Sequence, residues 1–161
     1  RQGARVIYSV RRGWCMIHVP RTAGTRLTAV LQELAPEAVA DVFWLKHASR
    51  AELPDRVQRL RTFCLVRPID VVRRSFYQHT VKWYISRQPD TIATVQWLEY
   101  AARVAGMTWE EFDRGRDLFP RDLTRWTDGA DTTFDYEASP WDAVARYCKV
   151  PPARLAAAMR R

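Results

Sequence analysis

The sequence contains no asparagine, and only three of its 26 basic residues are lysines. Its three cysteines form no C-x-x-C pair and do not cluster with the three histidines, which argues against a structural zinc site and a disulfide framework. The chain also lacks the roughly 18 consecutive apolar residues that a membrane helix needs. Free cysteines are typical of a reducing compartment. We therefore expect a soluble, cytoplasmic protein with no membrane span.

The residues that are present fit one ordinary folded domain. Of the 161 residues, 47% are hydrophobic and 27% are charged, which is typical of globular proteins and not of disordered chains. The length is close to that of one average domain, so we predict a single domain covering residues 1–161. The sequence begins with Arg1 rather than methionine, which we interpret as trimming or processing of a longer chain.

The charge is strongly positive. The 26 basic residues exceed the 18 acidic ones and give a net charge of +8. The planar guanidinium of arginine pairs with two oxygens of a phosphate or sulfate, so the surplus predicts an anionic partner. The preference for arginine over lysine and the absence of asparagine also follow from GC-rich coding, which explains most of the bias. The charge alone suits a nucleotide, an acidic glycan or a nucleic acid about equally.

Apolar periodicity predicts strands that alternate with helices. Residues 14–19 form an apolar run of strand length that ends at Pro20, and residues 26–34 carry apolar side chains at helical spacing. The same pattern returns with a strand at 62–66 and a helix at 71–83. Such alternation is typical of parallel β-α-β units, so the fold class that we predict is α/β.

Weaker signals predict further elements. These are a short strand at 39–45, two helical pieces within 48–61, a helix at 91–104, a strand at 132–136 and a helix at 141–147. Pro54 separates the two helical pieces. Thr108 and Glu111 form a capping-box pattern at a helix start. Ser139 followed by Pro140 predicts an N-cap with proline at the first helical position.

The segment 20–25, between the first predicted strand and its helix, is suited to binding an anion. Backbone N–H groups at a helix N-terminus have no intrahelical partner, and the helix dipole adds positive charge there. The side chains of the segment are small, hydroxyl-bearing or cationic: Ala23, Gly24, Thr22, Thr25 and Arg21. The Walker A pattern G-x-x-x-x-G-K-(S/T) is absent, which disfavours an ordinary ATPase or GTPase.

Both predicted strand-to-helix junctions contain residues in a recognisable pattern. The run Ile17-His-Val-Pro-Arg-Thr-Ala-Gly-Thr25 resembles the 5′-phosphosulfate loop, (F/I)-I-H-(I/V)-P-K-T-(G/A)-G-T, of sulfotransferases that use 3′-phosphoadenosine 5′-phosphosulfate (PAPS). The second family signature is an arginine followed eight residues later by a serine, and it resembles Arg67 and Ser75. Residues 46–53 are similar to a histidine-bearing segment of the carbohydrate-type branch, and 134–137 to a late strand that ends in glutamate.

The resemblance implies a three-layer P-loop-like fold with a small central parallel sheet flanked by helices. It implies in-line transfer of a sulfuryl group from PAPS to an acceptor hydroxyl or amine, with a histidine as general base and no metal. The implied catalytic residues are His47, as the base, and Arg21, which stabilises charge on the leaving phosphate. The implied cofactor-binding residues are Arg21, Thr22, Ala23, Gly24, Thr25, Arg26, Arg67 and Ser75.

The chain departs from the family pattern at two positions. Arg21 stands where the family usually has lysine. The positive charge is kept, but the guanidinium cannot donate its proton to a leaving group. Pro68 follows Arg67 directly, one residue earlier than in the family, so the local turn must differ. The implied partners are PAPS or its product nucleotide and a hydroxylated acceptor, either a glycan or a small molecule. We do not expect nucleic acid as a partner.

Two alternatives stay open from the residues themselves. A small P-loop-type nucleotide kinase shares the strand-loop-helix plan, and a non-catalytic module that binds anions or nucleic acid would use the same charge. We interpret His18 as a core residue of its strand and His79 as a surface residue of its helix. The adjacent Arg73 and Arg74 are interpreted as solvated.

Overall fold

The computed structural model describes residues 6–41, 48–86, 95–115 and 117–160. The chain divides into two compact units. The sheet unit comprises residues 1–67 and 123–161, and the helical unit comprises residues 68–122. The single domain over 1–161 stays a prediction, and each unit is considered by itself.

In the sheet unit, the described strands form one five-stranded mixed sheet with the order β3-β1-β2-β4-β5. The strands are β1 (Val6–Ser9), β2 (Trp14–Ile17), β3 (Val39–Asp41), β4 (Arg61–Val66) and β5 (Thr132–Asp135). β2, β4 and β5 are parallel neighbours, whereas β1 is antiparallel to β2 and β3. The predicted α/β class is confirmed, but the sheet is parallel only in part. The P-loop-like topology stays a prediction.

The antiparallel part arises from β1, which the sequence analysis did not predict. All four residues of β1 are buried. The hairpin between β1 and β2 closes through Gly13, whose N–H donates to the carbonyl oxygen of Ser9 at 2.8 Å. Gly13 has φ 74°, a left-handed conformation that glycine adopts without steric cost.

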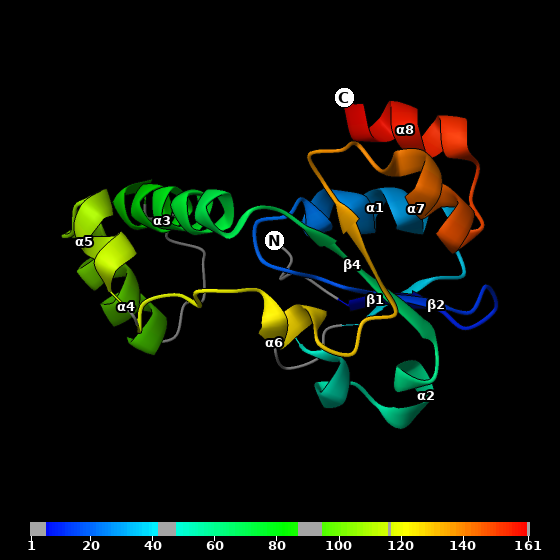
Figure 1. The fold of residues 1–161 in the computed structure, drawn as a ribbon, viewed down its shortest axis with the longest axis horizontal. Helices are drawn as coiled ribbons and strands as arrows, with labels where there is room; N and C mark the ends of the chain where they lie inside the picture. Colours follow the sequence, from blue (N-terminus) through cyan, green and yellow to red (C-terminus); the bar gives the residue numbers. More distant parts are fainter. Residues whose placement is uncertain (1–5, 42–47, 87–94, 116, 161) are drawn as a thin grey trace. The chain divides into compact units, whose positions relative to one another are not determined.

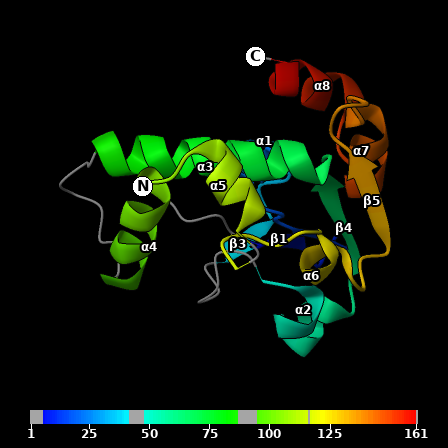
Figure 2. The ribbon, with the colours of Figure 1, turned by 60° about the vertical axis from the view of Figure 1, so that its left-hand side comes forward.

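Helices lie on both sides of this sheet. The helices of the sheet unit are α1 (Gly24–Leu34), the 3-10 helix η1 (Arg50–Glu52), α2 (Asp55–Gln58), α6 (Thr124–Thr127), α7 (Trp141–Cys148) and α8 (Pro152–Arg160). Figures 1 and 2 show α1, α7 and α8 over one face, where Leu31 and Val144 share a core with Phe63 of β4. The short helices α2 and α6 lie on the opposite side. The break at Pro54 is confirmed, since η1 and α2 flank it.

Two helix starts test the capping predictions. At α5 (Trp109–Arg114), the Thr108 hydroxyl accepts from the N–H of Glu111 at 3.2 Å, and the Glu111 carboxylate accepts from the N–H of Thr108 at 2.8 Å. The capping box is therefore confirmed. At α7 the N-cap prediction for Ser139 is wrong, because Pro140 occupies the N-cap position and Ser139 lies one residue earlier with φ 49°.

The helical unit consists, in its described part, of α3 (Ile69–Ser86), α4 (Val95–Ala105) and α5. Arg73 of α3 is only 2% exposed, and its guanidinium donates to the carboxylate of Asp113 at 3.1 Å and to the carbonyl oxygen of Phe119 at 2.8 Å. The prediction of a solvated Arg73 is therefore wrong, because backbone carbonyls more than 30 residues away satisfy it. In the described part of the chain, no helix is long and apolar enough to cross a membrane.

Candidate functional site

Three parallel strands of the sheet unit end at one edge of the sheet. The register pairs Ile17 with Cys64 and Val66 with Asp135, so the carboxyl ends of β2, β4 and β5 lie side by side. Ligands of open α/β sheets bind outside the carboxyl ends of parallel strands. The loop 18–23 follows β2, Arg67 follows β4, and Glu137 follows β5. This edge is the candidate site.

The loop after β2 has an unusual backbone. Arg21 has φ 62°, and Ala23 has φ 62° with ψ 15°, so two residues that are not glycine adopt left-handed conformations. Gly24 then begins α1 in the right-handed helical conformation. A left-handed residue beside a right-handed one turns successive N–H groups toward a single concavity that suits an anion. The predicted anion-binding loop therefore has the backbone form that such a role needs.

The first turn of α1 contributes no acidic side chain to its positive end. The N-cap residue is Ala23, which provides no side-chain hydrogen bond, and the first turn contains no acidic residue. The hydroxyl of Thr22 donates to the carbonyl oxygen of Val19 at 2.9 Å, so its single proton holds the loop together. Thr25 is exposed. Arg26, also a predicted cofactor-binding residue, donates to the carbonyl oxygen of Ala158 in α8 at 2.9 Å.

Gly24 is needed at its position because His18 fills the adjoining space. A Cβ atom placed on Gly24 would lie 2.9 Å from Cγ of His18 and would overlap Cδ2 and Nε2 of the same ring. His18 is 6% exposed, which agrees with its interpretation as a core residue. The imidazole therefore lies directly under the loop and supports its backbone.

Two arginines bring positive charge to the edge. Burial lowers the pKa of the Arg21 guanidinium, and the positive charge of Arg67 lowers it further. The charge of Arg67 therefore acts on the guanidinium of Arg21. The whole net charge also belongs to this unit: it contains 18 basic and 10 acidic residues, whereas the helical unit contains eight of each.

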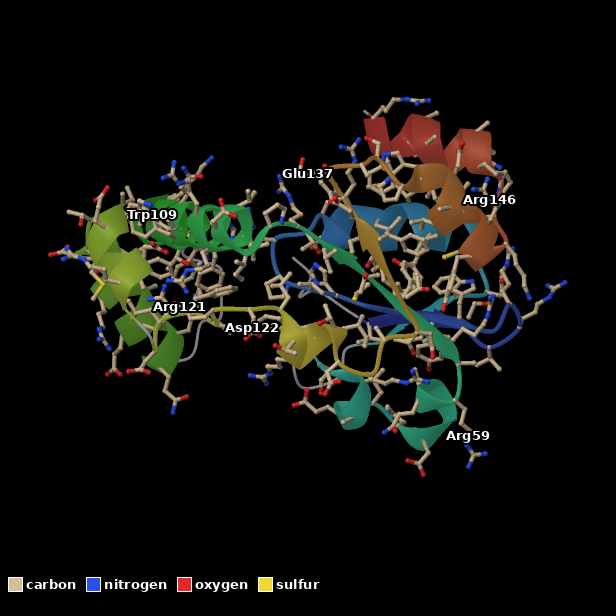
Figure 3. The ribbon with its side chains drawn as sticks, in the orientation of Figure 1. Arg59, Trp109, Arg121, Asp122, Glu137 and Arg146 are labelled. Atoms are coloured by element: carbon tan, nitrogen blue, oxygen red, sulfur yellow. The ribbon has the colours of Figure 1, made fainter. Side chains whose placement is uncertain are left out.

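Arg67 is held by two residues that follow β5. Its Nε donates to Oε1 of Glu137 at 2.7 Å, and its Nη2 lies 2.6 Å from the same oxygen in an ion pair. Its guanidinium carbon lies 4.9 Å from the centre of the Tyr136 ring. Figure 3 labels Glu137 just beyond the end of β5. Sequence reasoning noted this glutamate but gave it no partner, because 70 residues separate it from Arg67.

The remaining predicted site residues lie outside the described part of the sheet unit. Ser75 is a half-buried residue of α3 in the helical unit, so its role beside Arg67 stays a prediction. His47, the predicted base, lies outside the described residues. His79 is exposed on α3, as interpreted from the sequence.

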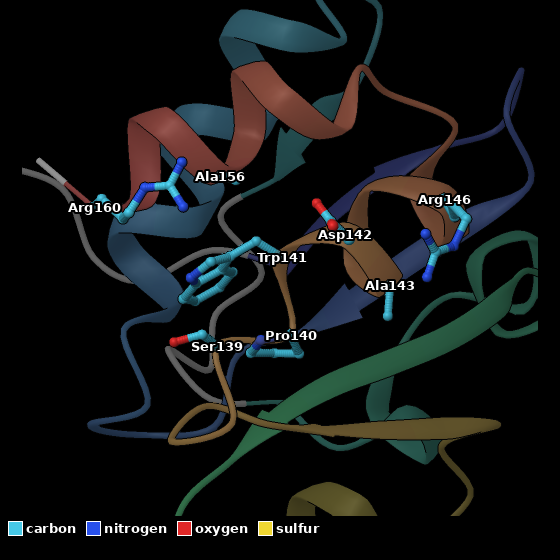
Figure 4. A pocket seen from close by; sticks show the side chains of 8 residues that line it. All are labelled: Ser139, Pro140, Trp141, Asp142, Ala143, Arg146, Ala156 and Arg160. Atoms are coloured by element: carbon cyan, nitrogen blue, oxygen red, sulfur yellow. The ribbon is translucent and has the colours of Figure 1, made fainter.

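A cavity of about 340 Å³ opens in the sheet unit, and Figure 4 shows the residues around it. It is lined by Ser139, Pro140, Trp141, Asp142, Ala143, Arg146, Ala156 and Arg160. None of the predicted site residues lines this cavity, and sequence reasoning did not find it. It adjoins the candidate site through ring contacts, since Trp141 packs edge-to-face on Tyr136 at 5.6 Å and Tyr136 underlies Arg67.

Within the described ranges, no group of three or more histidine, cysteine, aspartate or glutamate side chains could hold a metal ion. No protein-family model, curated protein or solved structure matches the chain. What the site can do chemically must therefore be argued from its own geometry, in which a loop with two left-handed residues precedes α1 and Arg67 follows β4.

Proposed function

We propose that this protein is a sulfotransferase that moves the sulfuryl group of PAPS to a hydroxyl or amine group of an acceptor. The observation that carries the proposal is the loop after β2, in which Arg21 and Ala23 adopt left-handed conformations before α1, while a second cation, Arg67, follows β4 at the same edge of the sheet. The sequence of this loop is the one that resembles the 5′-phosphosulfate loop. Two separate cationic points fit a nucleotide that carries two phosphate groups.

PAPS, when bound, supplies a sulfuryl group on a phosphate leaving group. The N–H groups at the start of α1 and the Arg21 guanidinium stabilise the negative charge that develops on that phosphate. The Arg21 guanidinium does not give up a proton, so its role is electrostatic. Arg67, with Ser75, holds the 3′-phosphate and thereby orients the donor. His47 accepts the proton of the acceptor.

The test compares three nucleotides by thermal unfolding. Adenosine 3′,5′-bisphosphate, the product nucleotide, should raise the melting temperature more than ADP or ATP does. At a concentration of 100 times Kd, a ligand of the native state stabilises by about 2.7 kcal/mol, which corresponds to roughly 5–10 °C for a chain of this length. Equal shifts for the three nucleotides, or none, contradict the proposal.

A matched pair of variants locates the binding. Arg67→Ala should remove most of the shift caused by the bisphosphate. Arg59→Ala deletes the same charge from an exposed position of the sheet unit, which Figure 3 labels beside α2, and should leave the shift unchanged. Equal losses in both variants would instead support the second candidate function, a non-catalytic anion-binding module, which the concentration of the net charge in this unit favours.

A further inference from the structure

The cavity of about 340 Å³, which residues of α7 and α8 line, lies next to the candidate site. Arg26 in the first turn of α1 donates to the carbonyl oxygen of Ala158 in α8 at 2.9 Å. Trp141 in the cavity wall packs edge-to-face on Tyr136, and the Tyr136 ring lies under Arg67. Direct contacts therefore join the two helices of the cavity to the start of α1 and to Arg67, the two points at which the proposed function places the nucleotide.

The cavity also belongs to the same edge of the sheet as the candidate site. β5 ends at Asp135, and the segment 136–140 leads from this carboxyl end to α7. Ser139 and Pro140 of this segment line the cavity. Because ligands of open α/β sheets bind outside the carboxyl ends of the strands, the cavity is well placed for a second reactant beside the nucleotide.

The charged side chains of the wall favour an anionic ligand. Arg146 and Arg160 carry two positive charges and Asp142 carries one negative charge, so the wall has one positive charge in excess. Asp142 and Arg146 lie one helical turn apart on α7, and an acid four residues before a base offsets its charge. Figure 4 shows Arg160 on the other side of Trp141 from these two residues. The excess charge therefore lies at the α8 end of the cavity, where the guanidinium suits a carboxylate.

The size and polarity of the cavity narrow the ligand further. Its volume is near the lower end of the range of about 300–1,000 Å³ in which proteins bind small ligands, so it suits a small molecule better than a glycan. The carboxylate of Asp142 accepts hydrogen bonds from hydroxyl groups, and the Ser139 hydroxyl both donates and accepts them. The Trp141 indole and the methyl group of Ala156 supply apolar surface. The complementary ligand has one carboxylate and several hydroxyl groups on a compact carbon frame.

We propose that this cavity is the acceptor site and that the acceptor is a small hydroxylated carboxylic acid. Arg160 pairs with its carboxylate, and Asp142 and Ser139 hydrogen-bond its hydroxyl groups. In the transfer, the bond from sulfur to the phosphate oxygen of PAPS breaks, a bond from sulfur to one acceptor hydroxyl oxygen forms, and that hydroxyl releases its proton. The role of the acid as acceptor rests on the proposed function, whereas its binding to the cavity does not.

The test compares three compounds that share one carbon ring. Quinate carries a carboxylate and hydroxyl groups, cyclohexanecarboxylate lacks the hydroxyl groups, and inositol lacks the carboxylate. Each is titrated into the isotope-labelled full chain while NMR records the backbone amide and indole N–H signals. Quinate should bind about tenfold more tightly than either of the others, because it alone satisfies both the arginine and the aspartate. Equal affinity of quinate and one of the others, or no binding of quinate, overturns the proposal.

A first pair of variants tests the role of the charge. Arg160→Gln removes the excess charge and should weaken quinate binding by about tenfold. Arg154→Gln removes an exposed cation from the same helix outside the cavity wall and should change the affinity by less than about twofold. Equal losses in the two variants indicate a general effect of charge and overturn the assignment of Arg160.

A second pair tests the cavity itself without changing any charge. Ala143→Leu enlarges a half-buried side chain of the wall and should weaken quinate binding by about tenfold or more, because the added atoms take the space of the ligand. Ala157→Leu makes the same change at an exposed position of α8 outside the wall and should leave the affinity unchanged. Both alanine and leucine favour a helix, so melting temperatures close to the wild type should show that the two variants fold. An unchanged quinate affinity in Ala143→Leu overturns the proposal.

The nucleotide separates the two hypotheses. If adenosine 3′,5′-bisphosphate stabilises the protein no more than ADP does, the proposed sulfotransferase fails, and the quinate titrations still decide whether the cavity binds such an acid. If the bisphosphate stabilises the protein as expected and quinate does not bind, the acceptor site is overturned and the proposed function stands.

Discussion

The close packing of His18 against Gly24 predicts that the effect of Gly24→Ala on stability depends on whether the His18 ring is present. Gly24→Ala adds a methyl group where the buried imidazole of His18 already lies, with Cγ at 2.9 Å from the new Cβ and Cδ2 and Nε2 in overlap with it. The ring is 6% exposed and cannot move aside without displacing the core. Gly24→Ala should therefore destabilise the protein.

The magnitude follows from two opposing contributions. Overpacking of a well-packed position costs about 1–3 kcal/mol. Alanine gains up to about 1 kcal/mol over glycine in a helix, and Gly24 is the first residue of α1. The expected net loss is about 1–2 kcal/mol in the free energy of unfolding, or roughly 3–6 °C in the melting temperature of a chain of this size.

Urea unfolding of a double-mutant cycle is the assay. In a His18→Ala background the space is vacated, so adding Gly24→Ala should be neutral or stabilising, with a coupling free energy of about 1–3 kcal/mol between the two positions. Gly106→Ala is the control, because its Cβ would meet nothing closer than 3.7 Å. A Gly24→Ala variant as stable as the wild type, or a loss that persists unchanged without the His18 ring, would refute the reasoning.

Two further predictions concern the loop and the thiols. Ala23→Gly relieves a left-handed conformation that costs about 1–2 kcal/mol. Glycine also raises the entropy of the unfolded chain, which offsets part of this gain. The free energy of unfolding measured in urea should therefore rise by about 0.5 kcal/mol. Arg21→Gly relieves the same strain but should weaken binding of adenosine 3′,5′-bisphosphate at least tenfold, whereas Ala23→Gly should not; equal affinities contradict the role of Arg21. Burial raises the pKa of Cys15 and Cys64 to about 12. At pH 8 neither thiol should therefore react with iodoacetamide until urea unfolds the chain. Alkylation without denaturant would contradict their burial.

The elements that could be predicted from the sequence are those whose signal is local. β2, the loop and α1 follow from an apolar run, a turn-prone segment and helical spacing, and the structure places β2 at Trp14–Ile17 and α1 at Gly24–Leu34. β1 could not be predicted in this way. Its four residues are buried because β2 and β3 pair with it from both sides, and that pairing is long-range.

The same division applies to the side chains. The anion-binding loop is contiguous in the sequence, so its residues could be named in advance. Arg73 was misinterpreted because the backbone carbonyls that bury it lie on α5 and the segment after it, in a different part of the sequence. Glu137 acquires its partner only when β4 and β5 become neighbours in the sheet.

The backbone of the loop is itself an argument for a ligand. Besides Arg21 and Ala23, the non-glycine residues with positive φ in the described part of the chain are Ser139 and Lys149. Lys149 is explained by helix termination, because it is the C-cap of α7 and its N–H donates to the last turn.

A helix N-cap ordinarily has extended dihedral angles, so a left-handed Ala23 is not explained by capping. The loop thus combines two left-handed residues that are not glycine with a glycine that has no room for a Cβ. Such a concentration of locally unfavourable choices is typical of a binding site. An alternation of left- and right-handed residues turns successive N–H groups toward one concavity, which is the backbone arrangement of many anion-binding loops.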